Sequence, residues 1–308
     1  MRVLYLTTGR SIHDYRFLAK LAEKNYEVYY LSLTNEVKKY EIDGIKSFFL
    51  ECNCTSEMSF FNKMLFGFWE YIRAYKRFRN ILNDLKPDIL HAGWIYSTGL
   101  MAAVSRYKPF LLMPWGSDIL ILPNKSVFFK KLSQYVIKRA DMVTCDAQIV
   151  KQKIIKLANY PEERIIVFPW GIDLSLFCYS EELRISTRKE LGWEDKKIVI
   201  MDRYFEPIYG IEYFLNALPK VVNEIPEVRI LLIGSGSLEK NFRKKINDLN
   251  ISKNVIFLGK IPNQELPKYL NASDLYVSSS LSDGSSLSLL EAMACALPVV
   301  VTDVPAIL

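Results

Sequence analysis

The sequence predicts an α/β protein of two parallel-sheet domains, and three observations point to this fold class. Short apolar runs typical of buried strands alternate along the chain with longer amphipathic patterns typical of helices. The alternation is broken once, by the polar stretch from Ser180 to Lys197. The length of 308 residues suits two domains of about 150 residues each. We therefore expect domains at residues 1–175 and 176–308, each with one sheet covered by helices on both faces.

The expected elements alternate between strand and helix through both halves of the chain. In the first half, helical spacing follows the first strand at Ile12, Phe17, Leu18 and Leu21, and the expected strands are Val3–Leu6, Val28–Leu33, Ile89–His91, Phe110–Met113, Met142–Cys145 and Ile165–Phe168. In the second half, the expected strands are Ile198–Met201, Arg229–Ile233, Val255–Leu258, Leu275–Val277 and Val299–Val301, and the expected helices are Ile211–Val222, Leu238–Asn250, Gln264–Leu270 and Ser286–Ala296. Ligands of such sheets bind at the carboxyl ends of the strands, so two facing sheets would form a cleft.

The charge of the chain is unevenly distributed. The formal net charge is +6, and residues 1–170 hold 25 Lys and Arg against 16 Asp and Glu, which is +9 and leaves −3 for the rest. A basic half attracts anions such as lipid headgroups, phosphorylated acceptors or nucleic acid, and charge alone does not choose among them. Because no zinc-finger, helix-turn-helix or RNA-binding aromatic motif accompanies the charge, we expect no nucleic-acid partner.

The cysteines and the N-terminus bear on the cellular compartment. Five scattered cysteines indicate free thiols in a reducing cytoplasm rather than a disulfide framework. Cys52 and Cys54 would supply half a metal site, but neither a second pair nor a nearby histidine completes it. The N-terminus lacks a signal-peptide pattern, and no run approaches the roughly 18 apolar residues of a spanning helix. We expect a cytoplasmic protein, either free in solution or bound at the inner face of the membrane.

Two glycine-containing turns carry the strongest chemical signals. Gly234-Ser235-Gly236-Ser237 joins a strand to a helix, where backbone N–H groups can approach a phosphate, although a tight turn needs glycine in any case. Farther along, Asp283 and Glu291 lie eight residues apart and bracket the turn Gly284-Ser285-Ser286 and the start of a helix. Glu291 stands in an apolar helical segment, and a carboxylate there is costly unless it accepts hydrogen bonds, for example from a ribose diol. A capped helix with one solvated glutamate is the alternative.

These residues resemble glycosyltransferase family 4, the retaining enzymes of the GT-B fold with two facing Rossmann-like domains. The resemblance rests on Asp283 and Glu291, on Ala292-Met293-Ala294, on Leu297-Pro298-Val299-Val300 and on Asp303. The segments Val255–Pro262 and Ser273–Ser280 look like the preceding blocks of the family, and Pro169–Asp173 looks like its interdomain segment. In the family the second domain continues past the Asp303 strand, so the resemblance implies a truncated second domain with an uncovered sheet edge.

The resemblance also implies roles for particular residues and no metal or other cofactor. Arg203 would pair with the donor diphosphate, Glu291 would hold the ribose and Asp283 would face the transferred sugar. The remaining donor-site residues would be Gly234, Gly236, Lys260, Gly284, Ser285 and Ser286, Asp118 would act catalytically with Asp283, and the acceptor side would hold Gly9, Arg10, His91 and Trp115. Three departures from the family pattern stand out: Tyr209 replaces a lysine, Asp283 replaces a glutamate, and Trp115 replaces a histidine. His13 and His91 remain, and packing is the alternative for each.

A basic aromatic segment, Phe60–Arg79, holds eight aromatic residues and five cations. Its composition suits a helix in the headgroup region of an anionic bilayer, and a helix that packs its aromatic residues on the sheet is the alternative. Lys125–Lys131 is a second, weaker patch of the same kind.

Together these observations predict transfer of a hexose from a UDP- or GDP-sugar to a hydroxyl of a glycan or a lipid-linked acceptor, with retention. Two alternatives stay open, a truncated noncatalytic remnant that binds sugar nucleotides and a GT-B nucleotide-sugar epimerase. A nicotinamide-dependent dehydrogenase is disfavoured because the three-glycine turn is absent from both halves.

Overall fold

The computed structural model describes residues 1–8, 12–33, 44–50 and 60–304, with the backbone alone for residues 12, 13, 15, 16 and 60–68. The chain divides into two compact units, Met1–Phe168 (unit 1) and Pro169–Leu308 (unit 2). The sequence placed this junction between residues 175 and 176. Each unit contains one sheet, and every strand pairing in both sheets is parallel.

Unit 1 contains a seven-stranded sheet in the order β3-β2-β1-β4-β5-β6-β7. Its strands are β1 Arg2–Thr7, β2 Glu27–Ser32, β3 Lys46–Phe49, β4 Ile89–Gly93, β5 Phe110–Met113, β6 Met142–Cys145 and β7 Ile165–Val167. Its α-helices are α1 Ile12–Glu23, α2 Phe60–Leu85, α3 Leu100–Ser105, α4 Ser117–Leu120, α5 Val127–Arg139 and α6 Gln148–Ala158. A π-helical turn, Ile95–Gly99, follows β4.

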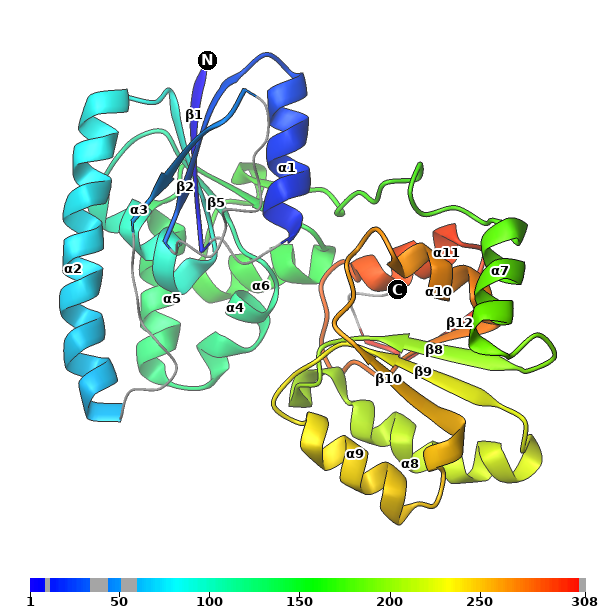
Figure 1. The fold of residues 1–308 in the computed structure, drawn as a ribbon. Helices are drawn as coiled ribbons and strands as arrows, with labels where there is room; N and C mark the ends of the chain where they lie inside the picture. The colour runs from blue at the N-terminus through cyan, green and yellow to red at the C-terminus, as the bar shows by residue number, and fades with distance from the viewer. Residues whose placement is uncertain (9–11, 34–43, 51–59, 305–308) are drawn as a thin grey trace. The chain divides into compact units, whose positions relative to one another are not determined.

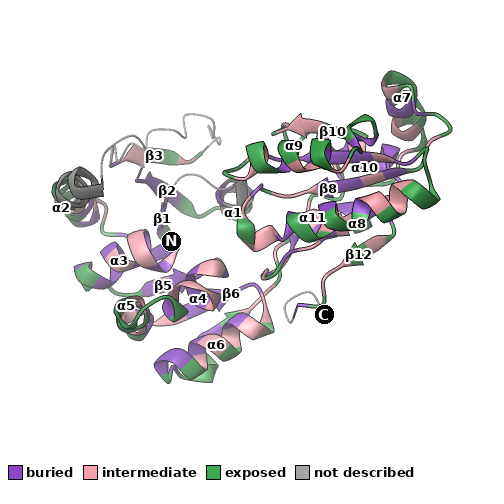
Figure 2. Ribbon diagram, turned by 90° about the horizontal axis from the view of Figure 1, so that it is seen from below, coloured by how far each residue is buried: buried purple, intermediate pink, exposed green. Residues whose placement is uncertain are grey.

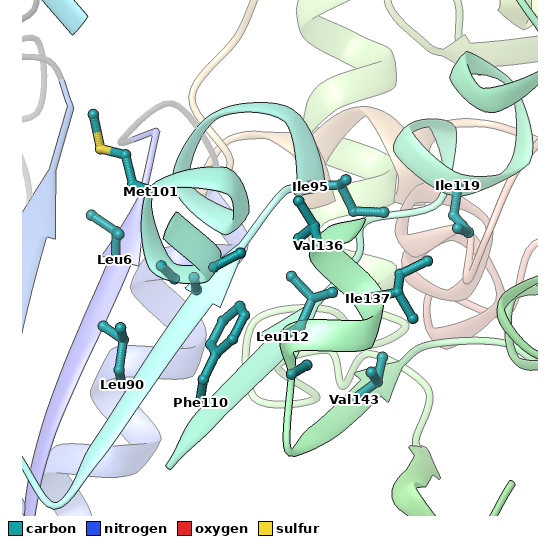
Figure 3. Close-up of a cluster of buried hydrophobic side chains, with 14 of the residues drawn as sticks. Leu6, Leu90, Ile95, Met101, Phe110, Leu112, Ile119, Val136, Ile137 and Val143 are labelled. Atoms are coloured by element: carbon teal, nitrogen blue, oxygen red, sulfur yellow. The ribbon is translucent and has the colours of Figure 1, made fainter. Parts of the chain in front are cut away.

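The two faces of the unit 1 sheet are covered unequally. Helices α2, α3, α5 and α6 contribute to one large core cluster with the strand residues that point toward them, among them Leu6, Leu90 and Leu112 (Figure 3). Helix α1 lies on the opposite side of the sheet (Figure 1). Because successive strand residues point to opposite faces, Tyr5 and His91 face away from this cluster.

Unit 2 contains a five-stranded sheet in the order β10-β9-β8-β11-β12. Its strands are β8 Ile198–Asp202, β9 Arg229–Ile233, β10 Val255–Gly259, β11 Leu275–Ser278 and β12 Val299–Val301. Its α-helices are α7 Glu181–Leu191, α8 Ile211–Glu224, α9 Glu239–Asp248, α10 Leu266–Ala272 and α11 Leu287–Ala294.

The unit 2 sheet separates two core clusters. One cluster lies under α7, α10 and α11 and includes Tyr276 and Leu289, and the other lies under α8 and α9 and includes Leu215 and Phe242. The helices are buried along the stripe that faces the sheet and exposed on the other side (Figure 2). An apolar hollow of about 390 Å³ lies over β11 and β12 beside α8.

Two elements differ from the sequence prediction. The strand β3 was not predicted, because its four residues offer only a brief apolar run beside the polar Lys46 and Ser47. The stretch after Ser180, predicted only as polar, contains the helix α7. Ser180 caps its first turn by accepting a hydrogen bond from the amide of Leu183, and Gly192 ends it in the left-handed conformation.

Candidate functional site

In the unit 2 sheet, the order of the strands reverses at β8, which pairs with β9 on one side and β11 on the other. Ligands of open α/β sheets bind outside the carboxyl ends of the strands at such a switch point. Arg203 directly follows β8, and residues 279–286 follow β11 and lead into α11. The topology therefore brings together the two segments in which the sequence predicted a donor site.

The guanidinium of Arg203 is the centre of this site. Its side chain is 8% exposed. The Nη2 atom donates a hydrogen bond to Asp283 Oδ2 at 2.7 Å and another to Ser286 Oγ, while Nε donates to Ser278 Oγ at 3.2 Å. Burial lowers the pKa of Arg203, but Tyr276 and Asp283 outweigh that effect and leave the pKa above its ordinary value. The group therefore stays positively charged at any physiological pH.

The turn before α11 is arranged around that guanidinium. Ser286 is the N-cap residue of α11, yet its hydroxyl accepts from Arg203 instead of capping the first turn of the helix. The amide of Gly284 donates to Asp283 Oδ1 at 3.1 Å. The amino end of a helix favours anions, because its first N–H groups have no partner within the helix. A cation and a helix amino end thus lie next to each other, which is an arrangement suited to a diphosphate.

Two carboxyl groups lie close to this centre, and the sequence analysis identified one of them. Glu291 is on α11 and only 5% exposed. Asp202, the last residue of β8, is the one it missed. Burial and then the charge of Glu291 raise the pKa of Asp202 to about 7, although Arg203 opposes this shift. No motif singles out Asp202, and only its position one residue before Arg203 could have suggested it.

The glycines of the Gly234–Ser237 turn are required by close packing. A Cβ at Gly234 would lie 2.0 Å from the carbonyl oxygen of Arg203, and one at Gly236 would lie 2.5 Å from that of Phe205. Gly234 also has a φ of +135°, a backbone conformation that side chains disfavour. These glycines let the turn lie directly against the loop that holds Arg203. Their predicted contact with the donor stays a prediction.

Several N–H groups of this turn already have partners within the protein. The amide of Gly234 donates to the carbonyl of Gly259 at 2.9 Å. The amide and hydroxyl of Ser237 donate to the two carboxylate oxygens of Glu206, at 2.8 and 2.7 Å, and lower the pKa of Glu206. A carboxylate therefore lies where the sequence suggested a phosphate. Lys260 is exposed directly after β10, and its predicted contact with the base stays a prediction.

Tyr209 stands where the family pattern has a lysine, so the sequence predicted that one cation is missing from the site. Its ring lies over Arg203, with 5.6 Å between the guanidinium carbon and the ring centroid. A ring face attracts a cation by about 0.5–2 kcal/mol. Tyr209 therefore holds Arg203 against its oxygen partners and brings no second positive charge.

In unit 1, Trp115 lies in the loop after β5 and Asp118 lies in the first turn of α4, which follows that loop. Asp118 is fully buried and accepts hydrogen bonds from the amides of Ile95 and Trp115, each at 2.9 Å. Burial raises the pKa of Asp118 to about 7, against the pull of these donors. The indole of Trp115 packs edge-on against Trp94, with 6.2 Å between the ring centroids. Asp118 thus fixes the π-helical turn after β4 to the loop after β5.

His91 is a buried ring in an aromatic cluster. Its centroid lies 4.9 Å from that of Tyr5 and 5.1 Å from that of Phe17, edge-on in both cases. Burial lowers the pKa of His91 to about 3, so the ring is neutral at physiological pH. This geometry favours the packing alternative. Gly9 and Arg10 lie outside the described residues, as does the side chain of His13.

The described part of the basic aromatic segment is a covering helix. Ala74, Phe78 and Leu82 of α2 are buried in the large core cluster of unit 1. Arg77 and Arg79 donate to backbone carbonyls, whereas Trp69 is 62% exposed. Over its described side chains α2 therefore packs on the sheet, and its predicted contact with a bilayer stays a prediction.

Metal sites and membrane-spanning helices can be assessed only for the residues that the structure describes, which are 1–8, 12–33, 44–50 and 60–304. Among these residues, no group of three or more His, Cys, Asp or Glu side chains is placed to hold a metal. The helices of these same residues are all too short or too polar to span a bilayer. Cys52 and Cys54 lie outside the described residues.

Comparisons with known proteins agree with this geometry in both units. Residues 2–147 match the family described as glycosyl transferase 4-like, and residues 184–308 match glycosyl transferases group 1. The chain belongs to the family-4 glycosyltransferases. Its predicted fold class, GT-B with two Rossmann-like domains, is confirmed by solved structures. One is Anabaena HepE in complex with UDP, with a TM-score of 0.76 and 19% identity over 99% of this chain and 82% of that one.

Two relatives show how similar the chain is to other members of the family and how much of their length it covers. The chain is 27% identical over 259 residues to alpha-monoglucosyldiacylglycerol synthase of Streptococcus pneumoniae (strain ATCC BAA-255 / R6), which covers 76% of this chain and 57% of the relative. It is 32% identical over 141 residues to a GDP-mannose-dependent monoacylated alpha-(1-6)-phosphatidylinositol monomannoside mannosyltransferase of Corynebacterium glutamicum, which covers 43% of this chain and 36% of the relative. The matched part of this family-4 chain therefore spans a little more than half of the first relative and about a third of the second.

Proposed function

We propose that the chain transfers a hexose from a UDP- or GDP-sugar to a hydroxyl of a glycan or a lipid-linked acceptor, with retention at the anomeric carbon. The observation that carries this proposal is the buried Arg203 guanidinium beside the amino end of α11, at the switch point of the unit 2 sheet. The relatives support it, because their names include a nucleotide-sugar donor and glycolipid products.

In the proposed complex the donor diphosphate binds Arg203 and the N–H groups of the Gly284–Ser286 turn. Arg203 now pairs with Asp283 at 2.7 Å, so a phosphate must either displace that carboxylate or share the guanidinium with it. Glu291 accepts hydrogen bonds from the ribose hydroxyls, since a buried carboxylate gains most from such donors. Released from Arg203, Asp283 would accept hydrogen bonds from the hydroxyls of the transferred sugar.

The proposed reaction breaks the bond between the anomeric carbon and the phosphate oxygen and forms a bond from that carbon to the acceptor oxygen. The acceptor proton passes to the departing phosphate, which makes a protein base unnecessary. Negative charge grows on the leaving diphosphate, and a fixed cation and helix N–H groups stabilise that charge in the transition state. We propose that these groups suffice without a metal ion.

The experiment measures binding first and turnover second. Calorimetry with UDP, GDP and ADP, followed by their hexose derivatives, should give a dissociation constant for one base at least ten times lower than for the others. The preferred donor is then incubated with glycan and diacylglycerol acceptors, with and without EDTA, and the products are identified by mass spectrometry.

A glycosylated acceptor formed equally well in EDTA would support the whole proposal. Binding without transfer to any acceptor or to water would identify a noncatalytic binder, and conversion of the donor to its epimer would identify an epimerase. No binding of any nucleotide would contradict the donor site itself.

A further inference from the structure

A basic hollow lies in unit 1 at the first turn of α5, outside every site described above. It has a volume of about 520 Å³ and eight lining residues, three of which are lysines. Lys130 comes from α5, and Lys153 and Lys156 come from α6. No carboxylate lines it. We call these three residues and the space between them the lysine hollow.

The charges of the lysine hollow are poorly compensated within the described part of the chain. Lys153 Nζ donates to Asn124 Oδ1 at 3.2 Å, which is a neutral partner. For Lys130 and Lys156 no hydrogen bond or ion pair is found among the described residues. Three cations around one space repel each other, and an anion bound among them removes that cost.

The backbone at the hollow also favours an anion. The N-cap residue of α5 is Ser126, whose Oγ accepts from the amide of Phe129 at 3.2 Å. The helix has 13 residues, and its amino end carries a partial positive charge. The lysines and the helix end therefore attract the same kind of group, an anion such as a phosphate.

Two apolar side chains next to the hollow indicate where that phosphate comes from. Val127 and Phe128, on the same first turn, are 71% and 69% exposed. A free phosphate gains nothing from them, whereas a lipid bilayer offers a phosphate layer directly above an apolar layer. Exposed apolar side chains beside lysines are typical of segments that lie in the interface of an anionic membrane.

We propose that the lysine hollow binds the phosphate of an anionic membrane lipid, with Val127 and Phe128 entering the apolar layer beneath. This proposal gives the protein its own contact with the membrane on which a lipid-linked acceptor would lie. It deepens the proposed function but does not depend on the donor site, because it uses residues of unit 1 alone.

The test measures binding of the full chain to vesicles by co-sedimentation. Vesicles of phosphatidylcholine with 30% phosphatidylglycerol (about one anionic lipid in three, enough for a negative surface potential) are compared with pure phosphatidylcholine. The main variant is Lys130→Glu/Lys156→Glu. The matched control is Lys24→Glu/Lys86→Glu, which makes the same charge change on exposed lysines just before β2 and β4, at the opposite end of the unit 1 sheet.

We expect wild type to bind the anionic vesicles and not the neutral ones. Since each lysine near an anionic surface contributes about 1 kcal/mol, the main variant should bind about 30-fold more weakly or worse. The control should stay within about threefold of wild type, because charges far from the contact act only through screened attraction. Phe128→Ser should weaken vesicle binding about tenfold, as expected for one apolar side chain kept out of the bilayer.

Three results would overturn the proposal. The first is that anionic vesicles do not retain wild type at all. The second is that both double variants lose binding equally, which would mean that net charge alone acts. The third result comes from acetylation of the lysine side chains, measured by mass spectrometry with either phosphate or vesicles present. If millimolar inorganic phosphate protected Lys130, Lys153 and Lys156 and anionic vesicles did not, the site would belong to free phosphate. Donor affinity and circular dichroism, measured on every variant, separate these outcomes from misfolding and from failure of the proposed function.

Discussion

The two sheets share the order of their first five strands but have different chemistry at their carboxyl ends. In unit 2, the switch point gathers charged and hydroxyl side chains around the cation of Arg203, in a region that stays partly open. In unit 1, the residues after β4 and β5 are held by a fully buried Asp118 that accepts only backbone N–H groups. His91 of β4 is neutral and enclosed by aromatic rings.

This difference shows that the strand order determines where a site can form but not which side chains form it. Parallel strands deliver their following loops to one edge in both units. Unit 2 fills that edge with groups that bind an anion, whereas the described part of unit 1 fills it with groups that fix the loops to one another. The four predictions below test this contrast, from the largest expected effect to the smallest.

The first prediction concerns the close approach of the turn to the Arg203 loop. Gly234→Ala should lower the free energy of unfolding of unit 2 by about 3 kcal/mol or more, because the new Cβ meets a carbonyl oxygen at 2.0 Å and φ is positive. Gly171→Ala, which meets nothing within 4 Å, should change it by less than about 0.5 kcal/mol. Urea unfolding, followed by hydrogen exchange in each unit separately, measures the free energy of unfolding of both variants. An equal loss of stability in the two variants would contradict the prediction.

The second prediction concerns the cation itself. Arg203→Met should weaken nucleotide binding about 100-fold, since charge-assisted hydrogen bonds contribute about 1.5–3 kcal/mol each. Calorimetry measures this with the nucleotide that wild type prefers. Arg243→Met, which removes an arginine that contacts Glu239 and Phe257 on the surface, is the control and should bind as wild type does. Weak binding by both variants would argue against a specific site at Arg203.

The third prediction uses pH to probe unit 1. His91 has a pKa of about 3 in the folded protein, below its ordinary value of 6.5, so the unfolded chain binds more protons between these values. Its contribution to stability is present above pH 6.5 and is lost as the pH falls toward 3. At pH 5 this loss is about 2 kcal/mol, and His91→Leu should therefore lose less stability than wild type between pH 7.5 and 5.

Unfolding in urea at both pH values measures this difference. His13→Gln supplies the control, because the chain has two histidines. Asp118 and Asp202 have raised pKa values of about 7. Their contributions to the free energy of unfolding therefore change with the opposite sign, because they are lost as the pH rises from about 4 to 7. They are unchanged in the His91 variant and cancel in the comparison, and identical pH slopes for variant and wild type would refute a buried neutral ring.

The fourth prediction concerns Tyr209. Tyr209→Leu removes the ring face from Arg203 and keeps an apolar side chain, so nucleotide binding should weaken about fivefold, the equivalent of a cation–π contact of about 1 kcal/mol. Tyr209→Phe keeps the ring and should bind within about twofold of wild type. If Tyr209→Phe were as weak as Tyr209→Leu, the hydroxyl rather than the ring would be the important group.

Much of the fold could be predicted from local pattern. The strands β5, β6, β9 and β12 have the predicted bounds, because each is a short and mostly apolar run whose ends are marked by a change in the local sequence. The helix α7 could not be predicted in this way. Its buried Arg188 donates to Asp274 and to the carbonyl of Ala272, 86 and 84 residues away, and neither partner is visible in the local sequence.

The sequence by itself determined the two-domain α/β class, the family and the segments that carry Arg203, Asp283 and Glu291, because strand periodicity and the spacing of acidic residues are local properties. Only the tertiary structure decided what these residues contact. It paired Arg203 with Asp283 across 80 residues, placed Asp202 beside Glu291 and packed Gly234 directly against the backbone of Arg203. The physical reason is that pairing, burial and pKa depend on distances between segments that only the folded sheet brings together.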